Sequence, residues 1–146
     1  MRIEDVKKIT DQTQLEKIAR TDEDSMLRIE AVQKLTSQDV LAELALNDEL
    51  GFIRSYAIKK LTDQTALKRV MSEDEDILNR NTAIRCLTDQ NILAEIINGG
   101  EEYVHQVKKI FLGDSTYFPE LENNTGTYTL DLRETARERL AELQGK

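Results

Sequence analysis

Ile9-Thr10-Asp11-Gln12 is a four-residue stretch that recurs three times along the chain at a constant 26-residue step. The copies are Leu35-Thr36-Ser37-Gln38, Leu61-Thr62-Asp63-Gln64 and Leu87-Thr88-Asp89-Gln90. Aliphatic columns such as Val6, Val32, Ile58 and Ile84 keep the same step. Agreement of so many columns at one period indicates an array of structural repeats.

Each repeat has the pattern of two helices. In the second repeat, Leu27, Ala31 and Leu35 are spaced by four residues, which places them on one face of a helix. A second and shorter helix is expected after each recurring stretch. Its N-caps are the residues with a short side-chain oxygen just before the glutamines, namely Asp11, Ser37, Asp63 and Asp89. The repeat is therefore predicted to be a helical hairpin.

A second pattern joins an aspartate to an arginine six residues later, followed by alanine, an aliphatic residue and leucine. It occurs at Asp22/Arg28, Asp48/Arg54 and Asp74/Arg80. With these residues the chain resembles HEAT-like repeat proteins over about residues 2–112. The resemblance implies an α-solenoid in which these six residues form a polar ladder between successive repeats. Common HEAT units of roughly 40–47 residues are longer, so a leucine-rich-variant-like solenoid is the alternative.

We therefore expect an all-α fold with one domain over residues 1–146: an α-solenoid of about five helix-turn-helix repeats. The repeats cover 1–112, and the fifth is placed by aligning Val107–Ile110 with Ile84–Leu87. Turn-forming residues and aromatics mark an irregular insertion at 113–129. Residues 130–146 are expected to form a capping helix, with Leu132, Ala136 and Leu140 on one stripe.

The composition narrows the classes of partner. The formal net charge of −8 argues against a general nucleic-acid binder, which carries a basic footprint. No apolar run approaches the roughly 20 residues of a membrane-spanning helix, and the start of the chain has no signal-peptide pattern. We expect a cytoplasmic protein, in its simplest form a monomer, that neither crosses membranes nor binds nucleic acid and whose partner is a protein.

The residues of catalysis are sparse. His105 is the only histidine and Cys86 the only cysteine, so neither has a second residue of its type for a metal site. A glycine-rich phosphate loop is absent from the sequence. We therefore predict no catalytic residue, no metal and no cofactor, and a non-catalytic protein-interaction scaffold. A HEAT-like lyase-type enzyme or ligand-binding relative is one alternative, because the signature of that class is mostly the repeat itself.

Three groups of residues are candidates for a binding surface. The first is a mildly apolar strip on the second helices, whose alternative is burial between helices: Val40, Leu46 and Ile92. The second is a basic stripe near the ends of the first helices: Lys34, Lys59, Lys60 and Arg85. Cations there complement the helix dipole, and binding of nucleic acid or another anionic partner is the alternative. The third is the aromatic pair Tyr117 and Phe118, either a plug at the end of the solenoid or a pocket wall.

Overall fold

The computed structural model describes residues 1–108 and 127–145 of the chain, which are mostly helical. The helices are α1 (Ile3–Lys8), α2 (Gln12–Thr21), α3 (Ser25–Lys34), α4 (Gln38–Asn47), α5 (Gly51–Ile58), α6 (Gln64–Glu73), α7 (Ile77–Cys86), α8 (Gln90–Ile97) and α9 (Leu132–Leu143). A short 3₁₀ turn (Glu101–Tyr103) leads into strand β1 (Val104–Lys108), and strand β2 (Thr127–Asp131) precedes α9.

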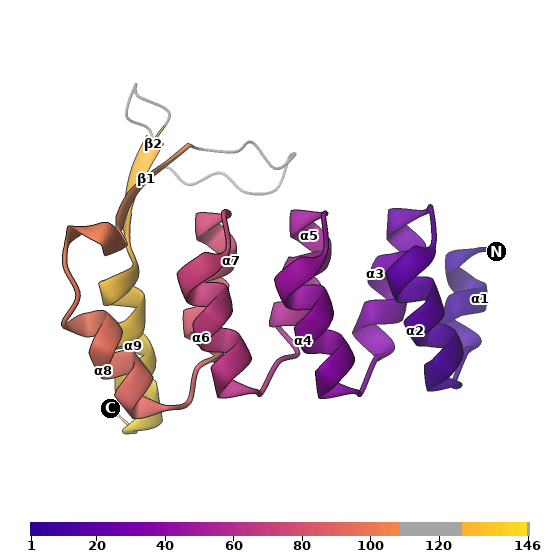
Figure 1. Ribbon diagram of the computed structural model, residues 1–146, viewed down its shortest axis with the longest axis horizontal. Helices are drawn as coiled ribbons and strands as arrows, with labels where there is room; N and C mark the ends of the chain where they lie inside the picture. Colours follow the sequence, from indigo (N-terminus) through magenta and orange to yellow (C-terminus); the bar gives the residue numbers. More distant parts are fainter. Residues whose placement is uncertain (109–126, 146) are drawn as a thin grey trace.

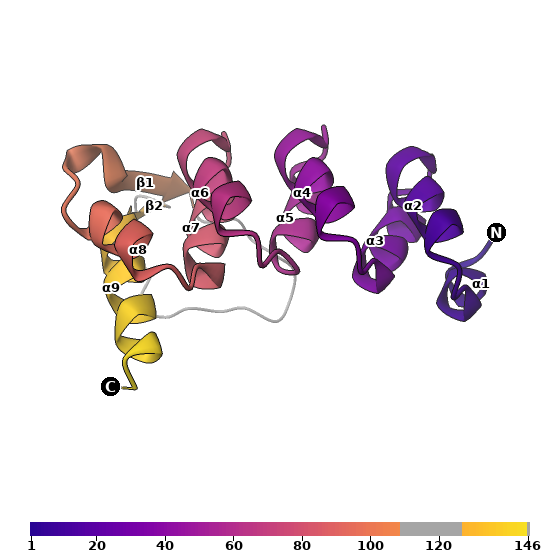
Figure 2. The ribbon, with the colours of Figure 1, turned by 60° about the horizontal axis from the view of Figure 1, so that its bottom comes forward.

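The helices pack as pairs of neighbours that follow one another in an elongated row (Figures 1 and 2). α2 packs on α3, α4 on α5, α6 on α7 and α8 on α9. The hairpins of the repeat are α1–α2, α3–α4, α5–α6 and α7–α8, so these close pairs join successive hairpins. The first helix of each hairpin also contacts the first helix of the next, from α1 through α3, α5 and α7 to α9. Among the helices that the structure describes, none has both the length and the apolar character that crossing a bilayer requires.

The apolar columns of the sequence form one continuous core along the row. Leu27, Ala31 and Val32 of α3 are buried, as are Leu41 and Leu44 of α4. The same cluster of buried side chains extends along the row from α1 to α9. A single helical hairpin leaves its apolar face open, and here each hairpin covers the apolar face of its neighbour.

The recurring stretch begins the second helix of each hairpin as predicted. Asp11, Ser37, Asp63 and Asp89 are the N-caps of α2, α4, α6 and α8, and each side chain accepts a hydrogen bond from a backbone N–H of the first turn. These caps satisfy amide groups that have no partner inside the helix.

The glutamine of the recurring stretch links one hairpin to the next. The side-chain nitrogen of Gln38 donates to the carbonyl of Lys60 at 3.0 Å, and its side-chain oxygen accepts from the backbone N–H of Thr62 at 2.9 Å. Gln12 makes the corresponding two bonds, and the oxygen of Gln64 accepts from two backbone N–H groups of the next hairpin. The glutamine therefore recurs because it holds neighbouring hairpins in register.

The prediction of a first helix for the fifth repeat is wrong for the described residues of that segment. Val104–Lys108 is a strand that pairs antiparallel with Thr127–Asp131, with His105 opposite Leu130. Residues 127–129, which the sequence placed in the irregular insertion, belong to this second strand. Hydrogen bonding to a distant segment fixes the conformation here, and local periodicity carries no information about such a partner.

α9 occupies the position of the missing first helix. It contacts α7 and α8, as α7 contacts α5 and α6. Its sequence repeats the first-helix pattern, because Leu132, Arg133 and Ala136 have the spacing of Leu27, Arg28 and Ala31. Leu132 and Ala136 are buried, and a guanidinium nitrogen of Arg133 donates to the carbonyl of Gly99 at 3.3 Å. A helix is thus present over most of the segment where the capping helix was expected, and residues 130 and 131 belong to β2.

Candidate functional site

Three tight turns lie along one edge of the row, where the second helix of a hairpin leads into the first helix of the next (Figure 1). They are residues 22–24, 48–50 and 74–76, and we call this edge, with the starts of α3, α5 and α7, the turn edge. Asp48 shapes its turn by accepting from the N–H of Leu50 at 3.0 Å, and Asp74 accepts from the N–H of Asp76 at 2.8 Å. A short aspartate side chain suits these positions because it can accept a hydrogen bond from a backbone N–H two residues later in the turn.

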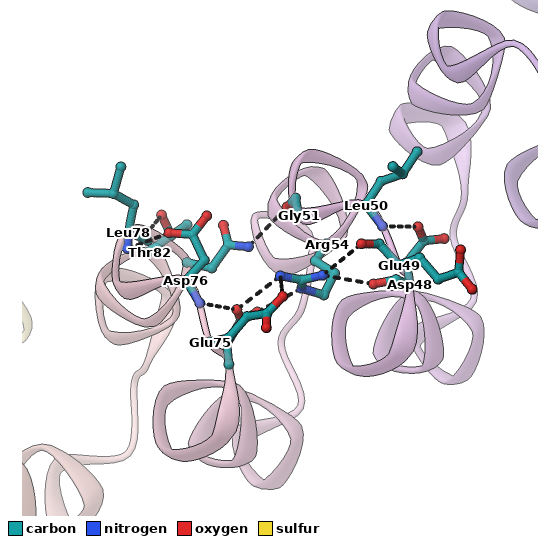
Figure 3. A network of polar contacts seen from close by, with 11 residues as sticks. Asp48, Glu49, Leu50, Gly51, Arg54, Glu75, Asp76, Leu78 and Thr82 are labelled. Atoms are coloured by element: carbon teal, nitrogen blue, oxygen red, sulfur yellow. Dashed lines mark hydrogen bonds and ion pairs between the residues drawn. The ribbon is translucent and has the colours of Figure 1, made fainter. Parts of the chain in front are cut away.

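An arginine joins two of these turns. The guanidinium of Arg54 bonds the carboxylate of Asp74 through Nε at 3.0 Å and Nη2 at 3.2 Å. Its Nη1 donates to the carbonyl of Asp48 at 2.9 Å (Figure 3). The hydrogen bond with Asp74 is the main cause of a raised pKa for Arg54. Arg28 makes the corresponding ion pair with Asp48 one hairpin earlier.

The two ends of the six-residue ladder differ from its middle. Arg80 donates through Nε to the carbonyl of Met71, and no carboxylate pairs with it within residues 1–108 and 127–145. The reason is in the sequence, since one repeat step after Asp74 the chain has Gly100. Asp22 accepts from the N–H of Asp24 and has no arginine partner in the same ranges. The structure therefore brings four of the six residues together as two pairs.

A shallow hollow of about 260 Å³ opens at the turn edge between the ends of α4 and α6. Its lining is formed by Ala45, Leu46, Asp48, Arg54, Val70, Glu73, Asp74 and Glu75. Leu46, which the sequence placed in an apolar strip for a partner, thus lines the hollow. The exposed residues of this lining are Glu73 and Glu75, whereas Ala45 and Val70 are almost fully buried.

Large apolar side chains recur along the turn edge. Met26, Phe52 and Leu78 are the second residues of α3, α5 and α7, and they are 54%, 45% and 39% exposed. They recur at the step of the repeat, and Leu50 beside Phe52 is 36% exposed. Among the described residues, only Met1 joins these four as an exposed large apolar side chain. We call Met26, Phe52 and Leu78 the exposed column.

No family model, curated protein or solved structure matches the chain.

The exposed column is a feature that was not predicted from the sequence. Its only signal was the constant step of the repeat, which the buried columns share. At the second position of a helix, one residue away from a buried leucine or isoleucine, an apolar side chain cannot be assigned to core or surface from periodicity alone.

The predicted apolar strip on the second helices is corrected by the structure. Val40 is 7% exposed and belongs to the core. Ile92 is half-buried and packs against the same core. Burial between helices, the alternative that the sequence left open, therefore holds for Val40, which is not available to a partner.

The basic stripe lies along the opposite edge, where its members have partners within the chain. The ammonium of Lys34 donates to the carbonyl of Val6 at 3.1 Å and to two further carbonyls at the end of α1. Lys60 donates to the carbonyl of Gln33 at the end of α3 at 2.5 Å, and burial lowers the pKa of this lysine. Both cations complete the C-terminus of the neighbouring first helix.

The other two stripe residues also have partners. The ammonium of Lys59 lies 5.3 Å from the centre of the Tyr56 ring, and Arg85 is 3.6 Å from a carboxylate oxygen of Glu138. A cation–π contact and an exposed ion pair are weak interactions. Each stripe residue is thus in contact with another group of the chain, and Arg85 is paired with an opposite charge.

Cys86 and His105, the residues with the most reactive side chains, lie on different elements, α7 and β1. Cys86 takes the place that Lys34 and Lys60 have in earlier repeats, and burial raises the pKa of its thiol. In the described ranges, no three His, Cys, Asp or Glu side chains are grouped to hold a metal ion. Tyr117 and Phe118 lie outside the described residues.

Proposed function

We propose that the chain is a HEAT-like α-solenoid that serves as a non-catalytic scaffold and binds a protein partner through its turn edge. The exposed column is the observation that carries the proposal. Three apolar side chains that are 39–54% exposed on one edge, at the step of the repeat, have no role in the core. Exposed apolar groups gathered on one surface are typical of sites for a protein partner.

The solenoid class is supported by how the hairpins join. Contacts run from each first helix to the next, and the same glutamine bridges three successive junctions. An array of this kind presents an extended edge, because every hairpin adds the same surface features at a regular interval.

A catalytic role has little support from the carboxylates of the hollow. Asp48 and Asp74, its two least exposed carboxylates, are held by arginines and by backbone N–H groups. A general acid or base needs a proton that can be exchanged with a substrate. The basic-stripe alternative also loses support, since Lys34 and Lys60 are engaged with helix ends.

Affinity capture from the native cell with three forms of the full chain tests the proposal. The edge variant Met26→Ser/Phe52→Ser/Leu78→Ser removes the exposed column. The matched control Thr36→Ala/Thr62→Ala/Thr88→Ala changes three exposed residues at the same step on the opposite edge. We expect a protein that wild type and control retain and the edge variant loses. Equal recovery by all three forms, or no enriched protein, contradicts the proposal.

A further inference from the structure

The exposed chemistry of the turn edge is both apolar and negative. Exposed carboxylates of Glu23, Glu49 and Glu75 accompany the exposed column in the three turns. Two arginines of this edge are largely covered, because the side chains of Arg28 and Arg54 are 11% and 10% exposed and paired with aspartates. Arg80 is half-buried, and its Nε donates to the carbonyl of Met71. A partner on this edge therefore meets apolar groups and carboxylates, with little positive charge.

The hollow has room for one long side chain beside carboxylates. Leu46 is the half-buried apolar residue of its lining, and the carboxylates of Glu73 and Glu75 are exposed beside it. Arg69 lies 3.3 Å from Glu73 and Arg54 lies 3.8 Å from Glu75, so these arginines balance part of the negative charge. Lysine and arginine bury an aliphatic stem against apolar surface and keep the charge at the tip. The volume of about 260 Å³ is below the roughly 300–1,000 Å³ of pockets for drug-sized ligands, which suits a side chain better than a free small molecule.

The spacing of the exposed column favours a helical partner. Packed helices lie roughly 8–10 Å apart, so we expect a similar distance between successive members of the column. In an α-helix, residues seven apart are separated by about 10.5 Å and share a face. A helix lying along the edge can thus offer one apolar residue to each of Met26, Phe52 and Leu78.

We propose that the turn edge binds a basic amphipathic helix of another protein, with a lysine or arginine of that helix in the hollow. The inference rests on the proposed function and adds the chemistry of the partner. Apolar residues of the helix, spaced by seven, contact the exposed column. Its remaining cations lie beside the carboxylates of the turns, where complementary charge speeds association and fixes orientation.

Negatively charged partners are repelled by the carboxylates of this edge. A second copy of the chain brings the same carboxylates and a net charge of −8. Nucleic acid and anionic lipid surfaces are repelled by the same groups. A protein helix that carries positive charge satisfies both the apolar and the acidic parts of the edge.

The test uses a synthetic 21-residue helical peptide with leucine at every seventh position and flanking lysines, labelled for fluorescence anisotropy. Full-length wild type is titrated against it beside Phe52→Ser/Leu78→Ser and Glu73→Gln/Glu75→Gln. The charge control is Glu16→Gln/Asp39→Asn, which removes two carboxylates from α2 and α4 away from the turn edge. Circular dichroism checks that every variant is folded. The same peptide with glutamate in place of lysine, double-stranded DNA and anionic vesicles are titrated in parallel.

We expect saturable binding of the lysine peptide that weakens with salt, and a Kd about tenfold higher for each edge variant, equivalent to about 1.4 kcal/mol. The charge control and wild type should bind alike, and the glutamate peptide should not bind. Absence of saturable binding, equal affinity for edge variants and control, or edge-dependent binding of DNA or vesicles overturns the proposal. If the edge variant loses a captured cellular protein while the lysine peptide fails to bind, the scaffold function stands and the basic helix does not.

Discussion

Arg54 and Asp74 form a two-contact ion pair between neighbouring hairpins, and their side chains are only 10% and 3% exposed. The same guanidinium donates to the carbonyl of Asp48. One arginine therefore ties α5 to the turns on both of its sides. Removing Arg54 leaves the carboxylate of Asp74 buried without its opposite charge. Removing Asp74 leaves the buried guanidinium with only the exposed carboxylate of Glu75, at 3.8 Å.

Asp74→Ala is expected to lower the free energy of unfolding by about 3 kcal/mol, the lower part of the range for breaking a buried pair from one side. Urea denaturation measures the change. The matched control is Arg20→Gln, which breaks the pair with Glu43 whose side chains are 33% and 53% exposed. Its cost should be below about 1 kcal/mol. Similar losses for both variants would show that burial does not strengthen the Arg54–Asp74 pair.

The glutamine bridges give a second prediction. Gln38→Ala removes two hydrogen bonds to the next hairpin and should cost about 2 kcal/mol, since each bond contributes roughly 1 kcal/mol. Gln90→Ala is the matched control, because Gln90 is exposed and its side chain bonds no residue of the described ranges. A denaturation midpoint that shifts equally for both variants would contradict the bridging role.

Much of this fold could be predicted because its rules are local. The N-caps of the second helices and the stripe of Leu27 and Ala31 follow from residue type and spacing within one helix. The resemblance to HEAT-like repeats implied a polar ladder between successive repeats, without saying which arginine pairs with which aspartate. The bidentate geometry and near-complete burial of the Arg54–Asp74 pair depend on how two hairpins pack and could not be seen in the sequence.

The position of the fifth first helix was predicted wrongly for a different reason. The alignment of Val107–Ile110 with Ile84–Leu87 puts Tyr103 where arginine is expected, and Tyr103 ends the 3₁₀ turn before β1. Arg133 occupies the first-helix place instead. The pattern of leucine, arginine and alanine at 132–136 was a usable signal, but it lay outside the expected step. The candidate site was also not predicted. Phe52 belongs to a column that recurs at the repeat step, as buried residues do, and only the packing of the helices shows that it is exposed.

A third prediction concerns how the stability of the folded protein depends on pH. The hydrogen bond from Arg133 lowers the pKa of Asp131, the N-cap of α9, in the folded protein. A lowered folded-state pKa adds stability above the unfolded-state value of about 3.9, and this stability is lost as pH falls through the folded-state pKa. The unfolding free energy of Asp131→Asn should therefore lie below that of wild type at pH 7, with a gap that narrows below about pH 4.

Denaturation at several pH values measures this gap. The control is the same substitution in an Arg133→Gln background, where the main cause of the pKa shift is gone. There the gap should be smaller and nearly independent of pH. A gap that is unchanged in that background would assign the effect to another partner of Asp131.

A fourth prediction separates binding from folding at the turn edge. Met26→Ser/Phe52→Ser/Leu78→Ser should change the unfolding free energy by less than about 0.5 kcal/mol for each site, because exposed substitutions cost little. Ile53→Ser is the contrast, since Ile53 is adjacent to Phe52 and fully buried. Thermal unfolding that is lowered as much by the edge variant as by Ile53→Ser would place the exposed column in the core.

The stacking of equal hairpins is tested most directly by adding one. A second copy of residues 38–63, inserted between Asp63 and Gln64, supplies a complete repeat unit with matching junctions. Small-angle X-ray scattering should show a folded particle whose longest dimension grows by about 10 Å, the spacing of packed helices, and urea should unfold it at a higher concentration. An unfolded chain, or a folded particle of unchanged length, would contradict the side-by-side array.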